Sequence, residues 1–73
     1  MKEGGDRLKM KLSDLRKRYK LTQRDMAKAI GISQPLYAMK EGRKRKFTPD
    51  EMTRVFIFFK KINTRLNMQD IFF

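Results

Sequence analysis

Four consecutive cations, Arg43, Lys44, Arg45 and Lys46, are the residues whose types and spacing point most directly to a chemistry. Guanidinium and ammonium groups donate charge-assisted hydrogen bonds, and phosphate is an acceptor that suits a row of them. Gln34 lies upstream in the same stretch, GISQPLYAMKEGRKRKF, and its amide can both donate and accept a hydrogen bond. The stretch therefore predicts contact with a phosphate-bearing partner; the alternative for the cations is a solvated loop that only aids solubility.

The whole chain is strongly basic, with nineteen Lys and Arg against eight Asp and Glu and a formal net charge of +11. Such a field attracts polyanions, so nucleic acid, an anionic membrane and an acidic protein are the candidate partners. The longest apolar run, VFIFF, is far shorter than the roughly 18 residues of a membrane span. The N-terminal MKEGGDRLKMK also lacks the apolar centre of a signal peptide. We therefore expect a soluble, cytoplasmic protein with no membrane partner.

Residues that support catalysis or metal binding are scarce in this sequence. It contains no cysteine and no histidine, the residues that form the usual zinc sites and many nucleophiles and general bases. It also has no glycine-rich phosphate loop, and its few carboxylates lie mostly where helices are expected to start. We expect a protein that is not an enzyme and that uses no metal and no cofactor.

The length of 73 residues fits one small domain. Residues 1–6 are polar and contain two glycines, which predicts a flexible N-terminal tail, and residues 7–73 are expected to form the folded domain. From Arg7 onward the apolar residues follow a helical period, beginning with Leu8, Leu12, Leu15 and Tyr19. The opposite face of this first helix carries Lys9, Arg16, Lys17, Arg18 and Lys20.

Capping residues divide the rest of the chain into four further helices. Thr22 and Ser33 are good N-caps, which predicts helices over residues 23–30 and 34–41, ended by Gly31 and Gly42. Thr48 followed by a proline predicts a helix over residues 49–62, and Asn67 caps a last helix over residues 68–72. The fold class is therefore all-α, a compact domain of five helices. The core stripe of the longest helix is expected to be Met52, Val55, Phe56, Phe59 and Ile62.

The stretch LTQRDMAKAIGISQ resembles the helix-turn-helix of the phage repressor and Cro family, whose bacterial relatives are often called the XRE family. The resemblance rests on Thr22-Gln23 at the start of a helix, Ala27 where two helices approach closely, and Gly31 at the turn, followed by an aliphatic residue and Ser33. It extends over about residues 8–72. It implies that helices 23–30 and 34–41 form a helix-turn-helix, the second being the recognition helix.

The resemblance implies that the protein is a regulator of transcription that binds double-stranded DNA as a homodimer. It also implies roles for single residues. Arg16 would pair with Glu41 and be oriented toward phosphate, and Gln34 would contact a base, adenine being the one that suits its amide. The expected phosphate contacts are Arg16, Lys17, Gln23, Arg43, Lys44, Arg45 and Lys46, of which Lys17 follows from the cluster of cations and not from the resemblance. The implied base-facing residues are Gln34, Pro35, Leu36 and Met39.

Two hypotheses of function follow from these patterns. The first is a DNA-binding regulator of the Cro or repressor type. The second is a phage-type modulator or antirepressor that keeps the fold but binds a repressor protein through the apolar face of helix 34–41. This second hypothesis rests on Pro35, Leu36 and Met39, whose side chains cannot hydrogen-bond to base edges. Ile57, Phe58 and Phe73 lie outside the core stripe, which indicates either a broad buried face or an apolar patch that pairs with another subunit.

Overall fold

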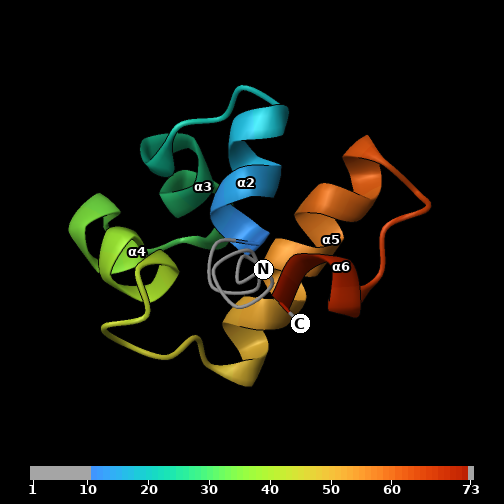
Figure 1. The fold of residues 1–73 in the computed structure, drawn as a ribbon. Helices are drawn as coiled ribbons and strands as arrows, with labels where there is room; N and C mark the ends of the chain where they lie inside the picture. Colours follow the sequence, from blue (N-terminus) through green and yellow to red (C-terminus); the bar gives the residue numbers. More distant parts are fainter. Residues whose placement is uncertain (1–10, 73) are drawn as a thin grey trace, which may run out of the picture.

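Five α-helices and no strand make up residues 11–72, the part of the chain that the structure, a computed structural model, describes (Figure 1). The helices are α2 (Lys11–Arg18), α3 (Gln23–Ile30), α4 (Gln34–Glu41), α5 (Pro49–Ile62) and α6 (Met68–Phe72). The predicted all-α class and the bounds of the last four helices are confirmed. The predictions for the tail 1–6, for the start of the first helix at residues 7–10 and for Phe73 lie outside the described residues.

Four helices begin at residues whose side chains satisfy the open amides of the first turn. Thr22 and Thr48 each form a capping box with the acidic residue three positions on, and Asn67 forms the same reciprocal pair with Asp70. The hydroxyl of Ser33 caps α4, accepting a hydrogen bond from the amide of the third residue of that helix. These local signals explain why the helix starts could be predicted from the sequence.

Three helices end at a residue in the left-handed conformation: Lys20 after α2 (φ 59°), Gly31 after α3 (φ 79°) and Arg43 after α4 (φ 67°). Beyond each one the chain folds back, as where the Lys44 amide donates to the Met39 carbonyl at 2.8 Å. This is the Schellman closure of a helix C-terminus. Glycine is favoured at such a position, yet Gly42 itself has φ −80° and the left-handed residue is the next one.

The hydrophobic core lies between α2, α3, α4 and α5, and α6 closes it. Its largest fully buried side chains are Tyr37, Phe59, Met26, Ile30, Ile71 and Val55. The predicted stripe of α5 is only partly right. Val55 and Phe59 are buried, but Ile62 remains 44% exposed, because it is the last residue of α5 and the chain leaves the helix there.

The two outlying apolar residues that the structure describes behave differently. Phe58 packs against the core, its ring 5.6 Å from that of Phe59 in an edge-to-face arrangement. Ile57 is 49% exposed on α5. The broad buried face is therefore correct for Phe58, whereas Ile57 is an exposed apolar side chain.

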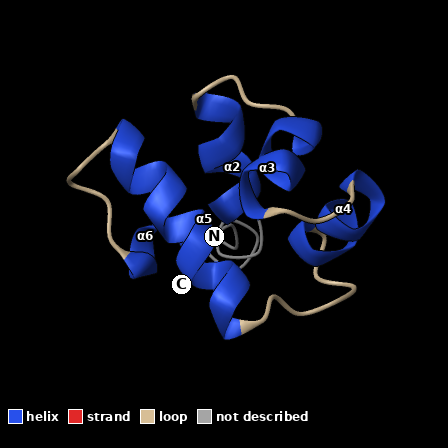
Figure 2. Ribbon diagram, turned by 180° about the vertical axis from the view of Figure 1, so that it is seen from behind, coloured by secondary structure: helices blue, strands red, loops and turns tan. Residues whose placement is uncertain are grey.

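The packing of the helices sets the positions of the candidate contact residues. α3 packs against both α4 and α5, and α2 packs against α6. The turn at residues 31–33 joins α3 to α4 as a helix-turn-helix. Views from opposite sides place α4 and the loop after it at one side of the molecule and α6 at the other (Figures 1 and 2). Among the described helices none has the length and apolarity needed to cross a membrane.

Candidate nucleic-acid interface

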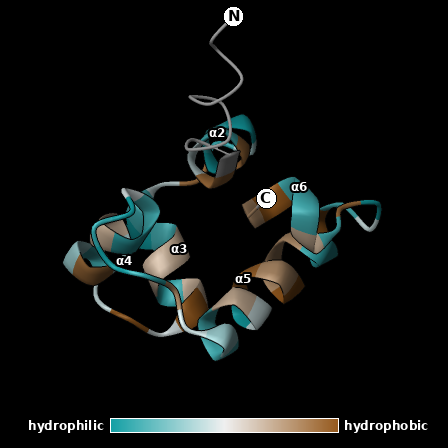
Figure 3. Ribbon diagram, turned by 60° about the horizontal axis from the view of Figure 1, so that its bottom comes forward, coloured by the Kyte–Doolittle hydropathy of each residue, from teal (hydrophilic) through white to brown (hydrophobic). Residues whose placement is uncertain are grey.

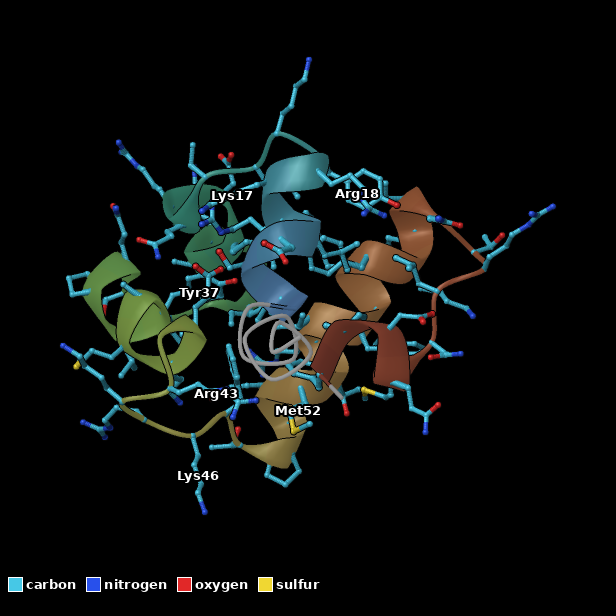
Figure 4. All side chains as sticks on the ribbon, viewed as in Figure 1. Lys17, Arg18, Tyr37, Arg43, Lys46 and Met52 are labelled. Atoms are coloured by element: carbon cyan, nitrogen blue, oxygen red, sulfur yellow. The ribbon has the colours of Figure 1, made fainter. Side chains whose placement is uncertain are left out.

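The loop between α4 and α5 presents a row of cations. Arg43, Lys44, Arg45 and Lys46 are all exposed, and none forms an ion pair with the described part of the chain. The loop is hydrophilic along most of its length (Figure 3), and Lys46 points away from the molecule (Figure 4). Four positive groups that have no acidic partner in residues 11–72 are therefore available to an external anion.

The backbone holds this loop against the end of α4. The Lys44 amide donates to the Met39 carbonyl at 2.8 Å, and the Arg43 amide donates to the Lys40 carbonyl at 3.2 Å. These bonds satisfy carbonyls that would otherwise be open at the helix end. As a result, the cations follow the last turn of α4 directly, and the backbone of Arg43 and Lys44 is held against that turn.

The predicted base-facing residues of α4 are accessible. Gln34 and Pro35 are exposed, and Leu36 and Met39 are half-buried. The Gln34 side chain makes no hydrogen bond within the described residues, so its amide is open to an external partner. Neither Leu36 nor Met39 belongs to the described core or to the partly buried side chains packed against it.

Glu41, at the end of α4, receives hydrogen bonds from three other side chains. Arg16 donates twice, from Nε to Oε2 at 2.7 Å and from Nη2 to Oε1 at 3.1 Å. Gln23 Nε2 donates to Oε1 at 3.0 Å, and Tyr37 Oη donates to Oε2 at 2.8 Å. The carboxylate thereby connects α2, α3 and α4, which fixes the orientation of α4. The expected pairing of Arg16 with Glu41 is present.

This environment shifts the pKa values of two groups in the cluster. Burial by itself would raise the pKa of Glu41, but the hydrogen bonds from Arg16, Gln23 and Tyr37 outweigh it and hold that pKa below its usual range. Burial, reinforced by the neighbouring Glu41 charge, raises the pKa of the Tyr37 hydroxyl. Glu41 is therefore ionised and Tyr37 neutral at pH 7, the states that their hydrogen bond requires.

The same geometry changes the interpretation of Arg16. The first helix was expected to carry Arg16 on its polar face, but the residue is only 8% exposed, because Glu41 reaches it from α4. Its third nitrogen, Nη1, donates to the Leu21 carbonyl at 2.8 Å. With all three nitrogens engaged inside the fold, Arg16 serves as a structural tie, and the geometry does not support its predicted contact with phosphate.

Gln23 and Lys17 differ in how freely they meet an external anion. The Gln23 amide is half-buried and donates to Glu41, so a phosphate contact there would use the backbone amides at the start of α3. Lys17 is exposed, and it extends from α2 toward α3, whereas its neighbour Arg18 extends toward α5 (Figure 4). Lys17 therefore lies on the side of α2 that faces the helix-turn-helix.

A second buried ion pair anchors α4, and the sequence did not predict it. Lys40 is buried, and its Nζ donates to Glu51 Oε1 on α5. The same carboxylate oxygen accepts the Thr48 amide at 2.9 Å in the capping box of α5. The pair holds the two ends of the basic loop close together, because Lys40 precedes the loop and Glu51 follows it. One sequence signal for the burial of Lys40 is its position three residues after Tyr37, on the inner face of the helix.

The described carboxylates are mostly committed to the fold. Asp25 and Asp70 take part in capping boxes, and Asp50 pairs with Arg54 at 3.1 Å on α5. Glu41 is the one acidic residue of α4, and its side chain is buried against Arg16. The outer face of α4 and the basic loop therefore present no carboxylate that would repel an anion.

These features define the class of protein: an all-α helix-turn-helix domain whose basic loop, without an ion pair to the described part of the chain, lies beside the outer face of the second helix of that motif. Comparison of the chain with protein families, with curated proteins and with solved structures gave no match.

Proposed function

We propose that the protein binds duplex DNA, with α4 in the major groove and residues 43–46 on the phosphate backbone, as a transcriptional regulator of the Cro and repressor type. One observation carries this proposal: exposed cations without acidic partners among residues 11–72 continue directly from a helix whose inner face is anchored by two ion pairs. An α-helix fits the major groove, and phosphate contacts position it there. Lys17 and the start of α3 would supply further contacts from the same side.

The experiment that tests this function is a fluorescence anisotropy titration with short duplexes over a range of salt concentrations. If about five phosphates are neutralised, the logarithm of the association constant should fall against that of the salt concentration with a slope near −4 to −5. Random duplexes should show this dependence as well, because it arises from the backbone. An affinity that does not change with salt would contradict phosphate as the main partner.

We further propose that the regulator acts as a homodimer, because two half-sites multiply the specificity of a small domain and place two recognition helices about 34 Å apart. The exposed Ile57 of α5 supports an apolar contact between copies. Sedimentation equilibrium should show a monomer–dimer equilibrium that Ile57→Lys shifts toward monomer. A monomer at all concentrations, with and without DNA, would remove this part of the proposal.

One observation favours a second function, that of a modulator or antirepressor that binds a repressor protein. The outer face of α4 is apolar at Pro35, Leu36 and Met39, and truncating an anchor residue at the centre of a protein interface can cost about 2 kcal/mol or more. Parallel titrations against DNA and against a phage-type repressor distinguish the two functions. A tight complex with the repressor and no binding to any duplex would establish the second.

A further inference from the structure

The starting observation is that α4 has two chemically distinct faces. Successive residues of an α-helix are turned by about 100°. Tyr37, Lys40 and Glu41 therefore share the inner face, where all three make hydrogen bonds to other residues of the fold. Pro35 and Met39 lie on the opposite side, with Leu36 beside them, so the outer face is apolar.

The outer apolar residues have no role inside the fold that would explain their character. Among the described residues, Leu36 and Met39 do not pack against the core, although both are large and only half-buried. Pro35 is exposed. An external partner that binds this face must therefore offer apolar groups, since none of these side chains donates a hydrogen bond and the Met39 thioether is only a weak acceptor.

The surroundings of the face restrict that partner to one that also carries negative charge. Lys44 is bonded through its backbone to Met39, so the cations of residues 43–46 begin within one turn of the apolar residues. The carboxylate of Glu41 is turned away and buried. An apolar surface bordered by phosphates is found in the major groove of DNA, where thymine presents its C5-methyl group.

We propose that the outer face of α4, formed by Pro35, Leu36 and Met39, recognises the C5-methyl groups of pyrimidines in the major groove, so that the protein selects thymine by its methyl group rather than by hydrogen bonds. This inference rests on the proposed DNA binding and specifies what the recognition helix reads. Gln34, the exposed first residue of α4, is a hydrogen-bonding side chain that directly precedes Pro35 in the chain.

Two pairs of duplexes test the inference without knowledge of the natural site. The first pair is a short A·T duplex made with thymine or with uracil, which differ only in the C5-methyl group. The second is a short G·C duplex made with cytosine or with 5-methylcytosine, which gains that group in the same groove. In anisotropy titrations at one salt concentration, each contacted methyl should strengthen binding about fourfold, the ratio expected for burying one methyl-sized group.

Matched variants assign the effect to the helix face. Leu36→Ala with Met39→Ala should abolish the preference for methylated duplexes in both pairs while leaving the salt dependence intact. Gln34→Ala should keep the methyl preference. Because Leu36 and Met39 lie outside the described core, the double variant is expected to fold, and its thermal unfolding checks this.

The outcomes separate this inference from the proposed function. Salt-dependent binding with equal affinity for the methylated and unmethylated member of both pairs overturns methyl recognition and leaves DNA binding standing. A methyl preference that survives in the folded double variant overturns the assignment to this face. Failure to bind any duplex overturns both proposals and favours a protein as the occupant of the face.

Discussion

The guanidinium of Arg16 on α2 meets the carboxylate of Glu41 on α4 in a two-point contact, at 2.7 Å from Nε and 3.1 Å from Nη2. The two residues are 25 positions apart in the chain. Bidentate geometry restricts both side chains more than a single hydrogen bond would. The direction of α4, and with it the direction of the apolar outer face, is therefore set from α2, an element on the other side of the cluster.

Removal of the Tyr37 hydroxyl should weaken this cluster without breaking it. In Tyr37→Phe the ring still fills the core, but Glu41 loses a hydrogen bond of 2.8 Å. Because the acceptor is charged, we expect the free energy of unfolding to fall by about 1.5 kcal/mol in urea denaturation. Tyr19→Phe is the matched control, since its hydroxyl accepts a 3.2 Å hydrogen bond from the neutral Asn63 and should cost less. Equal losses would show that the charge of Glu41 adds nothing.

Stability should decrease in acid, because the pKa of Glu41 is lower in the folded than in the unfolded protein. The carboxylate therefore contributes its full stabilisation above the unfolded pKa of about 4.3 and loses it as pH falls through the lower folded value. The pKa values of Asp25 and Glu51 are lowered too and act in the same direction. The difference between wild type and a variant without Glu41 isolates its share.

Replacing Glu41 alone would leave Arg16 buried without a partner, at a cost of about 3 kcal/mol or more. The variant without Glu41 must therefore remove the Arg16 charge as well. Arg16→Met combined with Glu41→Gln removes both charges, and its free energy of unfolding should depend less on pH between about pH 5 and 3 than that of wild type. Urea titrations at each pH measure this. If the free energy of unfolding of the two proteins changed equally with pH, the pKa of Glu41 would not be lowered in the folded protein.

The ion pair between Lys40 and Glu51 predicts an asymmetry between its two partners. Glu51→Gln can keep the capping box with Thr48 but leaves the Lys40 ammonium buried without a counter-charge, so we expect a loss of about 3 kcal/mol. Lys40→Met removes the buried cation and leaves Glu51, the more exposed partner, with a hydrogen bond from the Thr48 amide, so it should cost less than Glu51→Gln. Chemical denaturation compares the two, and the reverse order would mean that the pair does not carry a buried charge.

Arg43→Gly should raise the stability of the fold and weaken the binding of DNA. Arg43 holds a positive φ of 67°, which glycine adopts without strain, so the variant should gain up to about 1 kcal/mol in the free energy of unfolding. It should also bind DNA more weakly, with a salt slope shallower by about 1, because one cation of the loop is lost. Lys20→Gly is the control: φ is 59° there, and a similar gain is expected with unchanged binding.

Lys44→Ala together with Lys46→Ala should weaken binding to every duplex alike. The loss of two phosphate contacts should make the salt slope shallower by about 2. Lys61→Ala with Arg65→Ala removes the same charge from exposed positions at and after the end of α5, away from α4, and should leave the slope nearly unchanged (Figure 1). If both double variants changed the slope equally, the binding would depend on net charge and not on the loop.

Much of the fold was determined by the sequence alone, because the signals that begin and end helices are local. Thr22, Ser33 and Thr48 cap helices through hydrogen bonds to residues three positions away, so these caps can be recognised from the local sequence. The apolar spacing of α3 and α5 placed Met26, Ile30 and Phe59 in the core. The four cations after α4 and their exposure also followed from the sequence.

Tertiary packing decided what helical periodicity leaves open, namely which polar side chain is enclosed by a neighbouring helix. Arg16 and Lys40 are both cations, yet both are buried, because Glu41 and Glu51 reach them from other helices. Ile62 continues an apolar stripe and is exposed, because α5 ends there. The helical repeat gives the direction of a side chain around its own helix. The partner of that side chain depends on how helices distant in the chain come together. The sequence thus placed the cations along the chain, and the contacts between helices determined which of them are free to bind.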